Sequence, residues 1–569
     1  MVNNEYIWEI VLSYLARPQV AVNKASWKAT TKRAERPYFM TVWHHDTFDE
    51  QNEEENDEAG LVRRSSSLIA RFLLRRVLRR NVLDYAKELE VVDKMLKTLS
   101  VPSPPHLVLI FVSGKWSNRL IQIRKALRFR FNSNKTVIAG GASRGLICAR
   151  ANAQPFELES EDSGIVLAVI RLAQTEDCVS MAYVPCRIPH ALDEPVINAL
   201  SKTMNPRLIL VLGNEYRASV EAVTLANEYA NTAIQYCAIS GGILGCGKDP
   251  DSTCQIILDG PLQNNDAFPR VLPSDSNSFI PGAIVLALGG QLEAVSAGSR
   301  GAKLVGPFVY KISQVEQRQI AVCPGHSILL DSIKKFQCVA QRSYPEDETL
   351  SPCEFQEYRT SYETVRELLR FERTTPRTIL LGVKPNNNAL NPNGFALLIP
   401  QSVDEDSIIV DASKAKYRDG HVATGDLVAW HTLSAEASRT ELRLAARACR
   451  EHLMLGSAQS PLRQGLDESL SVLGGIVFSC CGRGRNFHGR ELADSSAIRS
   501  AIPDIPLIGI FANAEIGPPL FNEWSGGPST RAPAKCDGYT CQASILRLDG
   551  VIIDHPPSDD NDDQTFVTT

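Results

Sequence analysis

The sequence lacks several features that would define its class at once. It has no run of about 18 apolar residues, the length that a membrane-spanning helix needs, and its apolar runs, such as Ala283–Leu288, are as short as a strand. Glu5 and Glu9 interrupt the first apolar segment, and no basic leader precedes them, so we expect no signal peptide. These absences argue against a membrane protein.

Short metal-binding and redox motifs are missing as well. The 14 cysteines include no Cys-x-x-Cys pair, and the 10 histidines show no His-Glu-x-x-His spacing. Scattered thiols of this kind are typical of a reducing compartment. We therefore expect no metal and no cofactor, and a cytoplasmic or nuclear location.

No charge of one sign dominates the chain. Its 60 Lys and Arg residues stand against 65 Asp and Glu residues, which gives a net charge of −5. A protein that binds nucleic acid over a whole domain is usually basic, so the balance argues against this partner. With 569 residues, of which 44% are hydrophobic and 22% charged, the composition is that of a globular protein of roughly three or four domains.

Residues 1–45 carry a helical pattern. The spacing of their apolar residues predicts three short helices, which Pro18 and Pro37 separate. The third of these helices would hold Tyr38, Phe39, Val42 and Trp43. A unit of this size buries too little surface to be stable alone, so we expect it to dock onto a partner.

Charged segments flank the rest of the chain. Residues 46–66 include seven carboxylates in ten positions and predict a solvated acidic linker. Residues 67–104 combine many arginines with a helical pattern and predict a charged helical connector. Its arginines fit either a nuclear-import or RNA-binding patch or the charged face of a helix. Residues 553–569 predict an acidic, disordered tail.

From residue 105 onward, apolar strands alternate with amphipathic helices. This alternation predicts a mixed α/β (α+β) fold with two layered domains, over 105–318 and 319–552. The strands are expected at His106–Val112, Thr136–Ala139, Ile165–Ile170, Arg207–Leu212, Ala233–Ile239, Ile256–Leu258, Ile284–Leu288, Thr378–Val383, Phe395–Ile399, Ile408–Val410, Leu427–His431, Leu473–Ser479, Leu507–Phe511 and Ala543–Leu548. The helices are expected at Arg119–Phe129, Ala218–Tyr229, Ala435–Leu453 and Glu491–Ile502.

Two segments suggest catalysis, and each also has a plain structural interpretation. Residues 242–248 match part of a phosphate-binding loop, but Asp249 stands where magnesium binding needs Ser or Thr, so the segment also fits a glycine turn. Cys480 and Cys481 follow a strand and precede His488, which allows a thiol–imidazole pair for nucleophilic catalysis. Adjacent cysteines at a strand end are also typical of buried, inert thiols.

The strands at Leu473–Ser479 and Leu507–Phe511 each run into a charged residue, Arg483 and Glu515 respectively. If the strands are parallel neighbours, both charges emerge at one edge, where open α/β sheets bind ligands. Arginine and glutamate together would complement a zwitterion such as an amino acid. The alternative is that the two side chains form a partly buried salt bridge with each other.

These two segments resemble the FIST C domain. The motif reads Cys480-Cys481-Gly482-Arg483-Gly484 and, after a helix, Pro506-Leu-x-Gly-x5-Glu515-Ile516, with Ala514 where the family usually has glycine. Val137–Gly145, Ala238–Gly242 and Ala297–Gly306 are similar to the glycine-rich turns of FIST N domains. The resemblance implies a ligand or substrate site at Gly482, Arg483, Gly484, Asn513, Glu515 and Gly517.

The first 45 residues resemble a divergent F-box. Val11-Leu12-x-x-Leu15, Val22-x4-Trp27 and Val42-Trp43 match its pattern, but Tyr6-Ile7-Trp8 replaces the usual opening Leu-Pro. The resemblance implies that these helices dock on a Skp1-like adaptor. The contacts would come from Trp8, Ile10, Val11, Leu12, Leu15 and Trp27, although Trp27 fits an internal core position equally well.

Joined to FIST domains, an F-box implies a non-catalytic substrate-recognition subunit of an SCF-type (cullin-RING) ubiquitin ligase. Its partners would be the Skp1-like adaptor, the cullin-RING scaffold and a protein substrate, without nucleic acid or membrane. The alternative is a sensory FIST module of signal transduction that binds a small amino-acid-like ligand. A third possibility, an ATPase or cysteine hydrolase, would depend on Lys248 or Cys480, and we expect no such activity.

Overall fold

The chain divides into two compact units, residues 1–36 and 37–569. A computed structural model describes residues 38–45, 88–99, 101, 104–131, 135–159, 162–172, 178–186, 193–203, 206–232, 237–245, 256–259, 281–305, 308–323, 326–341, 358–360, 363–366, 379–385, 395–403, 407–411, 421–458, 472–518, 534–538 and 540–548. The two F-box helices predicted before Pro37, the acidic linker, the arginine-rich stretch, Lys248, Asp249 and the acidic tail lie outside these residues.

The described residues form a mixed α/β fold, as predicted, and three of its sheets share one plan. Each sheet centres on two parallel strands that a helical crossover joins, and an antiparallel strand flanks the pair on either side. The central strands are almost continuously apolar, because both of their faces are buried. The helices that accompany these three sheets are η1 (Gly114–Arg119), α4 (Leu120–Arg130), α5 (Asp193–Leu200), α6 (Tyr216–Thr232), α8 (Ala435–Ala458), α9 (Arg485–His488) and α10 (Ala493–Ala501).

The strand orders are β1-β6-β2-β3-β10 in sheet A, β12-β26-β22-β23-β4-β5 in sheet B and β7-β11-β8-β9-β24-β25 in sheet C. Sheet A comprises β1 (Tyr38–His45), β2 (Leu107–Ser113), β3 (Val137–Ala142), β6 (Gly164–Arg171) and β10 (Ile256–Asp259). Sheet B comprises β4 (Gly145–Ala149), β5 (Phe156–Leu158), β12 (Leu292–Ser299), β22 (Val472–Cys480), β23 (Leu507–Ala512) and β26 (Cys541–Leu548). Sheet C comprises β7 (Val179–Pro185), β8 (Leu208–Gly213), β9 (Ala238–Ile243), β11 (Gly282–Leu288), β24 (Ala514–Gly517) and β25 (Lys535–Asp537).

The strand that follows each parallel pair leaves its own sheet and joins another. β4 follows β3 of sheet A and pairs with β23 of sheet B, and β24 follows β23 and pairs with β9 of sheet C. β10 follows β9 and pairs with β3, which closes the ring of exchanges. The domain boundary expected at residues 318 and 319 falls inside β14 (Phe308–Cys323), and strands from both sides of it share sheets B and C.

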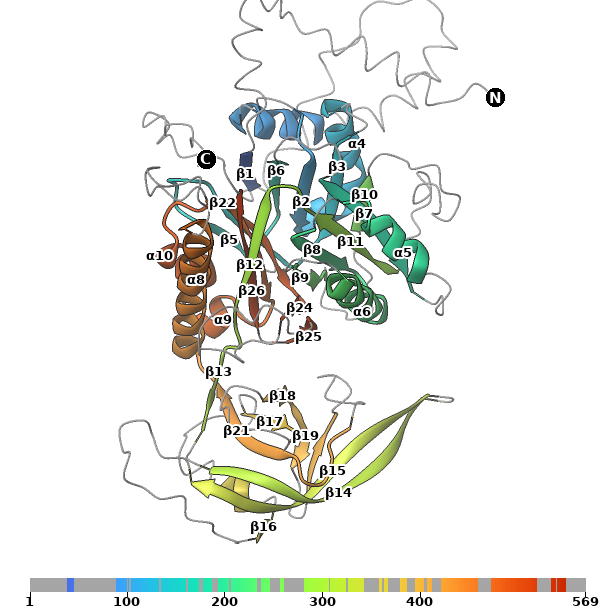
Figure 1. The fold of residues 1–569 in the computed structure, drawn as a ribbon, viewed down its shortest axis with the longest axis vertical. Coiled ribbons are helices and arrows are strands. Elements are labelled where there is room, and N and C mark those ends of the chain that lie inside the picture. Colours follow the sequence, from blue (N-terminus) through green and yellow to red (C-terminus); the bar gives the residue numbers. More distant parts are fainter. Residues whose placement is uncertain are drawn as a thin grey trace, which may run out of the picture. The chain divides into compact units, whose positions relative to one another are not determined.

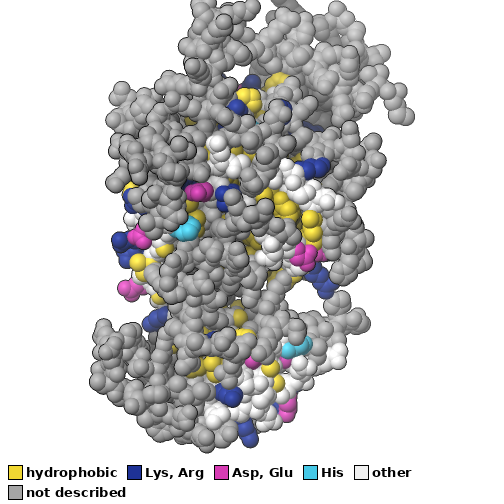
Figure 2. All heavy atoms as spheres, in the orientation of Figure 1, with side chains coloured by type: hydrophobic (Ala, Val, Ile, Leu, Met, Phe, Trp, Pro, Cys, Tyr) yellow, Lys and Arg dark blue, Asp and Glu magenta, His cyan; other side chains and the backbone are white. Residues whose placement is uncertain are grey.

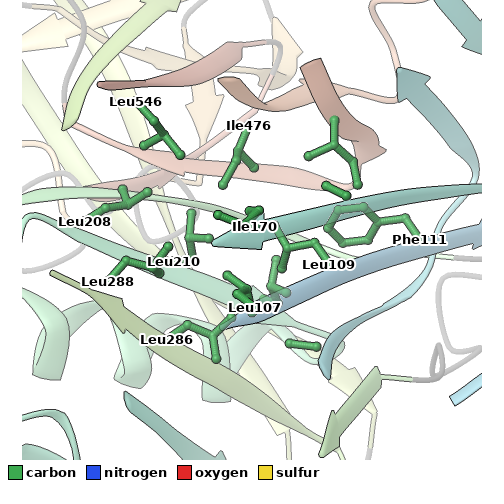
Figure 3. Packing of buried hydrophobic residues seen from close by; sticks show 14 of the residues in the cluster. Leu107, Leu109, Phe111, Ile170, Leu208, Leu210, Leu286, Leu288, Ile476 and Leu546 are labelled. Atoms are coloured by element: carbon green, nitrogen blue, oxygen red, sulfur yellow. The ribbon is translucent and has the colours of Figure 1, made fainter. Parts of the chain in front are cut away.

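The inward faces of these three sheets form one apolar core. Leu109 from sheet A, Leu210 from sheet C and Ile476 from sheet B are among its buried members (Figure 3). Each such side chain contributes about 1.5–3 kcal/mol through burial. The outer faces pack against helices: sheet A against η1, α4 and the helix over residues 88–99, sheet C against α5 and α6, and sheet B against α8 and α10 (Figure 1).

A fourth sheet, sheet D, has the order β18-β17-β21-β14-β15-β20-β19; in addition, β13 pairs with β21 and β16 pairs with β15. Its longest part is the antiparallel hairpin of β14 and β15, two strands of 16 residues each (Figure 1). Its own core includes Tyr310, Phe336 and Trp430. The remaining bounds are β13 (Ala302–Leu304), β15 (His326–Gln341), β16 (Tyr358–Thr360), β17 (Ile379–Lys384), β18 (Ala396–Leu398), β19 (Pro400–Val403), β20 (Ile408–Val410) and β21 (Leu427–Leu433).

One predicted helix is wrong, while the connector helix is confirmed in part. Residues 38–45 form strand β1 at the edge of sheet A rather than the third helix of an F-box. Phe39 faces the central core and Val42 faces the layer of α4, so both faces of the strand are buried, as its alternating side chains require. In the connector, residues 88–99 are helical, and Val92 and Met95 are buried.

No helix within the described ranges is long and apolar enough to cross a membrane. On the face drawn in Figure 2, the coloured Lys and Arg side chains lie interspersed with Asp and Glu. This mixture fits the near balance of the two charges along the whole sequence.

Candidate functional site

The ends of several strands converge at the candidate site. β22 and β23 are parallel neighbours, which is the condition on which the sequence argument depended, and their last pair is Cys480 with Ala512. Ser143, in the turn between β3 and β4, donates its Oγ hydrogen to the Phe511 carbonyl at 2.7 Å. The backbone N–H of Asn513 donates to Ile243 at the end of β9, at 2.8 Å. Segments of sheets A, B and C therefore meet where the FIST C motif lies.

Arg483 is held inside the protein by Asp494 of α10. Its Nη2 lies 2.8 Å from Oδ1 and its Nε lies 3.1 Å from Oδ2, so the two side chains form a two-pronged pair. Both are almost fully buried, at 1% and 2% exposed. Ser479 also donates to Asp494 at 2.6 Å, and His488 Nε2 lies 3.3 Å from its Oδ1. We call these four residues the Arg483 network.

The electrostatics of this network favour the charged forms of both partners. Burial alone would raise the pKa of Asp494, but the Arg483 guanidinium and the hydrogen bonds from its neighbours hold that pKa well below its usual range. Burial alone would likewise lower the pKa of Arg483, and Asp494 raises it above its usual value instead. Arg483 therefore has a structural role, because it fastens the turn after β22 to α10.

Glu515 lies on β24 and is fully buried. Its Oε2 accepts hydrogen bonds from the backbone N–H and the hydroxyl of Thr540, at 3.1 and 2.9 Å. Its Oε1 has no hydrogen-bond partner among the described residues. Burial raises the pKa of Glu515 well above its usual value, the Thr540 bonds oppose this rise, and a negative charge on Cys481 adds to it.

The two interpretations offered for Arg483 and Glu515 therefore need correction. Arg483 pairs with Asp494 and Glu515 with Thr540, so the salt bridge expected between them is replaced by two separate partnerships. The physical reason is that the first turn of α10 places the carboxylate of Asp494 next to Arg483. A zwitterion would find Arg483 already occupied by Asp494, which leaves Glu515 as the acidic residue of the pair with an unpartnered oxygen.

The other residues that the resemblance names have mixed surroundings. Gly482 and Asn513 are exposed, at the turns after β22 and β23. A side chain at Gly484 would collide with the Glu159 carboxylate, and one at Gly517 would collide with Gln542. Both colliding groups are the far ends of flexible side chains, which can shift at small cost, so packing alone does not require either glycine.

The thiol–imidazole pair that the sequence allowed for catalysis does not form among the described residues. His488 turns its ring toward Asp494 and Arg439, inside the Arg483 network, while Cys480 is buried at the end of β22. Gly242, the first glycine of the phosphate-loop pattern, lies within strand β9 opposite Glu515. Over the described residues, no group of three or more His, Cys, Asp or Glu side chains could hold a metal ion.

Sequence reasoning missed three residues that shape the site. Asp494 could have been found, because an acidic residue in the first turn of a predicted helix is a recognised signal. Thr540 and Arg144 come from distant segments, and no local pattern marks either one. The Arg144 guanidinium forms a hydrogen bond with Cys481.

Comparison with known proteins agrees with the motif at this site. Residues 362–518 match the family model of the FIST C domain, and this range includes β22, β23 and α10. The comparison finds no F-box and no FIST N domain, so these two parts of the resemblance stay predictions. Two uncharacterized proteins of Mycobacterium tuberculosis, from strains CDC 1551 / Oshkosh and ATCC 25618 / H37Rv, are each 30% identical over 148 residues, which is 25% of this chain. The chain spans 36% of the length of each of these relatives.

Proposed function

We propose that this chain is the substrate-recognition subunit of an SCF-type ubiquitin ligase. The observation that supports this role best is the boundary between the two compact units, after Arg36. The F-box-like spacing of Leu12, Leu15 and Trp27 lies wholly before this boundary, as expected of a separate docking module. Val42 and Trp43 belong to strand β1, so the proposed module is shorter than the sequence indicated.

The body that carries the FIST C domain would hold the protein to be ubiquitinated. A ligase of this class accelerates transfer by bringing the target lysine close to the charged E2, so its receptor needs no catalytic residue of its own. Buried and paired charges such as Arg483 and Asp494 suit this role, because they fix the shape of a binding body.

The docking step gives the first prediction. In the full chain, Leu15→Asp should reduce co-purification of a Skp1-like adaptor at least about tenfold, because a charge on the apolar stripe that the sequence predicts here opposes burial. The measurement is a pull-down with quantification of the adaptor. Leu444→Asp, on an exposed position of α8, is the matched control and should leave adaptor capture unchanged. Undiminished capture by the Leu15 variant would refute the docking role.

A second candidate function has support from Glu515. A sensory FIST module that recognises an amino-acid-like ligand would need a hydrogen-bond acceptor for the ammonium, and the unpartnered Oε1 of Glu515 is such an acceptor. The positive charge of the ammonium would also favour the ionised form of this carboxyl. This candidate needs no adaptor and no ubiquitin.

The second prediction tests this sensory role. At least one amino acid at high millimolar concentration should raise the melting temperature of the wild-type chain, because ligand that binds only the folded state stabilises it. The shift should vanish in Glu515→Gln and persist in Glu436→Gln, where an exposed carboxylate at the start of α8 is neutralised. The absence of any shift over the full amino-acid panel would eliminate this function.

A further inference from the structure

Cys481 differs from the other described cysteines in its surroundings. It is exposed, whereas Cys148, Cys237, Cys449 and Cys541 are buried. It occupies the first position after β22, where its backbone N–H donates to the Ala512 carbonyl at 2.8 Å and fixes the start of the turn. Its sulfur is thus presented to solvent from a rigid strand end.

Groups from four strands or turns surround this sulfur. Arg144 reaches it from the turn between β3 and β4 with a hydrogen bond, and the buried Cys480 thiol bonds to it from β22. Asn513, at the end of β23, places its Oδ1 at 3.8 Å from the sulfur. Glu515 on β24 is the nearby carboxyl, and a negative charge on the sulfur raises its pKa further. We call Cys481, Cys480, Arg144 and Asn513 the thiol cluster.

From this arrangement we propose that Cys481 is a peroxide-reactive cysteine and that Cys480 is its resolving partner. An accessible thiol beside a guanidinium, with a second thiol within hydrogen-bonding reach, has the parts that a reversible thiol switch needs. The inference concerns modification of this chain and does not depend on which of the two functions is correct.

The electrostatics agree with this geometry. The hydrogen bond from Cys480 and the charge of Arg144 outweigh burial and lower the pKa of Cys481 to about 6. The same hydrogen bond, together with burial, raises the pKa of Cys480 well above its usual value. At neutral pH the outer sulfur is therefore a thiolate and the inner sulfur a protonated thiol, which is the division of roles that attack and resolution require.

The chemistry balances with hydrogen peroxide as the named oxidant. The Cys481 thiolate attacks one peroxide oxygen, the O–O bond breaks, and the hydroxide that leaves takes up a proton, so that sulfenic acid and water form. Cys480 then loses its proton and attacks the Cys481 sulfur, an S–S bond replaces the S–O bond, and a second water leaves. Consecutive Cα atoms lie about 3.8 Å apart, below the usual span of a disulfide, so the product would be strained and readily reduced.

An alkylation experiment tests the thiolate. The full chain is treated briefly with iodoacetamide over a pH series, and labelling of each cysteine is read by peptide mass spectrometry. Cys481 should reach half of its maximal rate near pH 6, against about 8.5 for an ordinary cysteine. Arg144→Gln should move this midpoint to higher pH. A wild-type midpoint at the ordinary value would overturn the proposal.

A peroxide experiment tests the resolving step. The wild-type chain should lose the mass of two hydrogen atoms at the Cys480–Cys481 peptide and regain it with a thiol reductant. Cys480→Ser should instead accumulate a sulfenic acid at Cys481 that dimedone traps, and Cys481→Ser should do neither. Melting curves of both variants check that the fold is intact. Sulfenic acid that persists in the wild type, or peroxide resistance of Cys481, would each refute the paired role.

Discussion

Replacing Arg483 by Met should lower the free energy of unfolding by about 3–5 kcal/mol, because the substitution leaves Asp494 buried without its cation. Asp494 would keep only Ser479 and His488, and neither supplies the two-pronged contact of a guanidinium. Urea unfolding followed by the fluorescence of the buried Trp116 measures the change.

Arg485, two positions along the same motif, offers a matched control. Its side chain is 70% exposed, and its Glu491 partner at 3.1 Å is 57% exposed, so Arg485→Met should cost no more than about 1 kcal/mol. Both substitutions remove one guanidinium that is paired with a carboxylate, one pair buried and two-pronged, the other exposed. If the two variants unfold at the same urea concentration, the Arg483 network does not hold the turn after β22 in place.

The second large effect is expected at Gly509, in the centre of β23. A Cβ atom there would lie 2.1 Å from the Val477 carbonyl oxygen of the parallel neighbour β22, and backbone atoms cannot move aside cheaply. Gly509→Ala should therefore destabilise the chain by at least about 3 kcal/mol, the upper end of overpacking costs. Gly140 and Gly241 occupy the matching positions of β3 and β9, with 1.7 and 2.0 Å, and the same substitution should be similarly harmful there.

Gly538 is the control for this series. A Cβ atom at Gly538 meets nothing within 4 Å, so Gly538→Ala should change stability by less than about 0.5 kcal/mol. The loss of stability is measured by comparing the yield of soluble protein and the urea midpoint of unfolding across the four variants. An alanine at Gly509 that is as well tolerated as one at Gly538 would contradict the close approach of β22 and β23.

Local pattern was enough to find the central strands, including the two strands of the motif, but not to fix their pairing. The predicted strand Leu473–Ser479 lies within β22, and Leu507–Phe511 lies within β23, because buried parallel strands are nearly continuous apolar runs. The β14–β15 hairpin was not predicted. Residues such as Lys311, Gln314 and Glu316 interrupt its apolar positions, and only pairing between its two strands makes the segment extended.

The partners of charged residues were harder to predict than the strands. The sequence placed Arg483 and Glu515 at one edge, and the parallel pairing of β22 with β23 confirms the premise of that argument. Which groups they contact depends on where α10 and Thr540 arrive, and these positions are set by long-range packing. The same holds for β1. The pattern of its residues alone also fits an apolar helix, and the segment is extended because it pairs with the edge of β6 in sheet A.

The placement of β26 has a consequence for synthesis on the ribosome. β26 lies between β12 and β22, although about 240 residues separate it from β12 along the chain. At about 5–20 residues per second, the edge of β12 stays open for roughly 10–50 s after it has been translated. Open strand edges template aggregation, so we expect the nascent chain to rely on chaperones until β26 emerges.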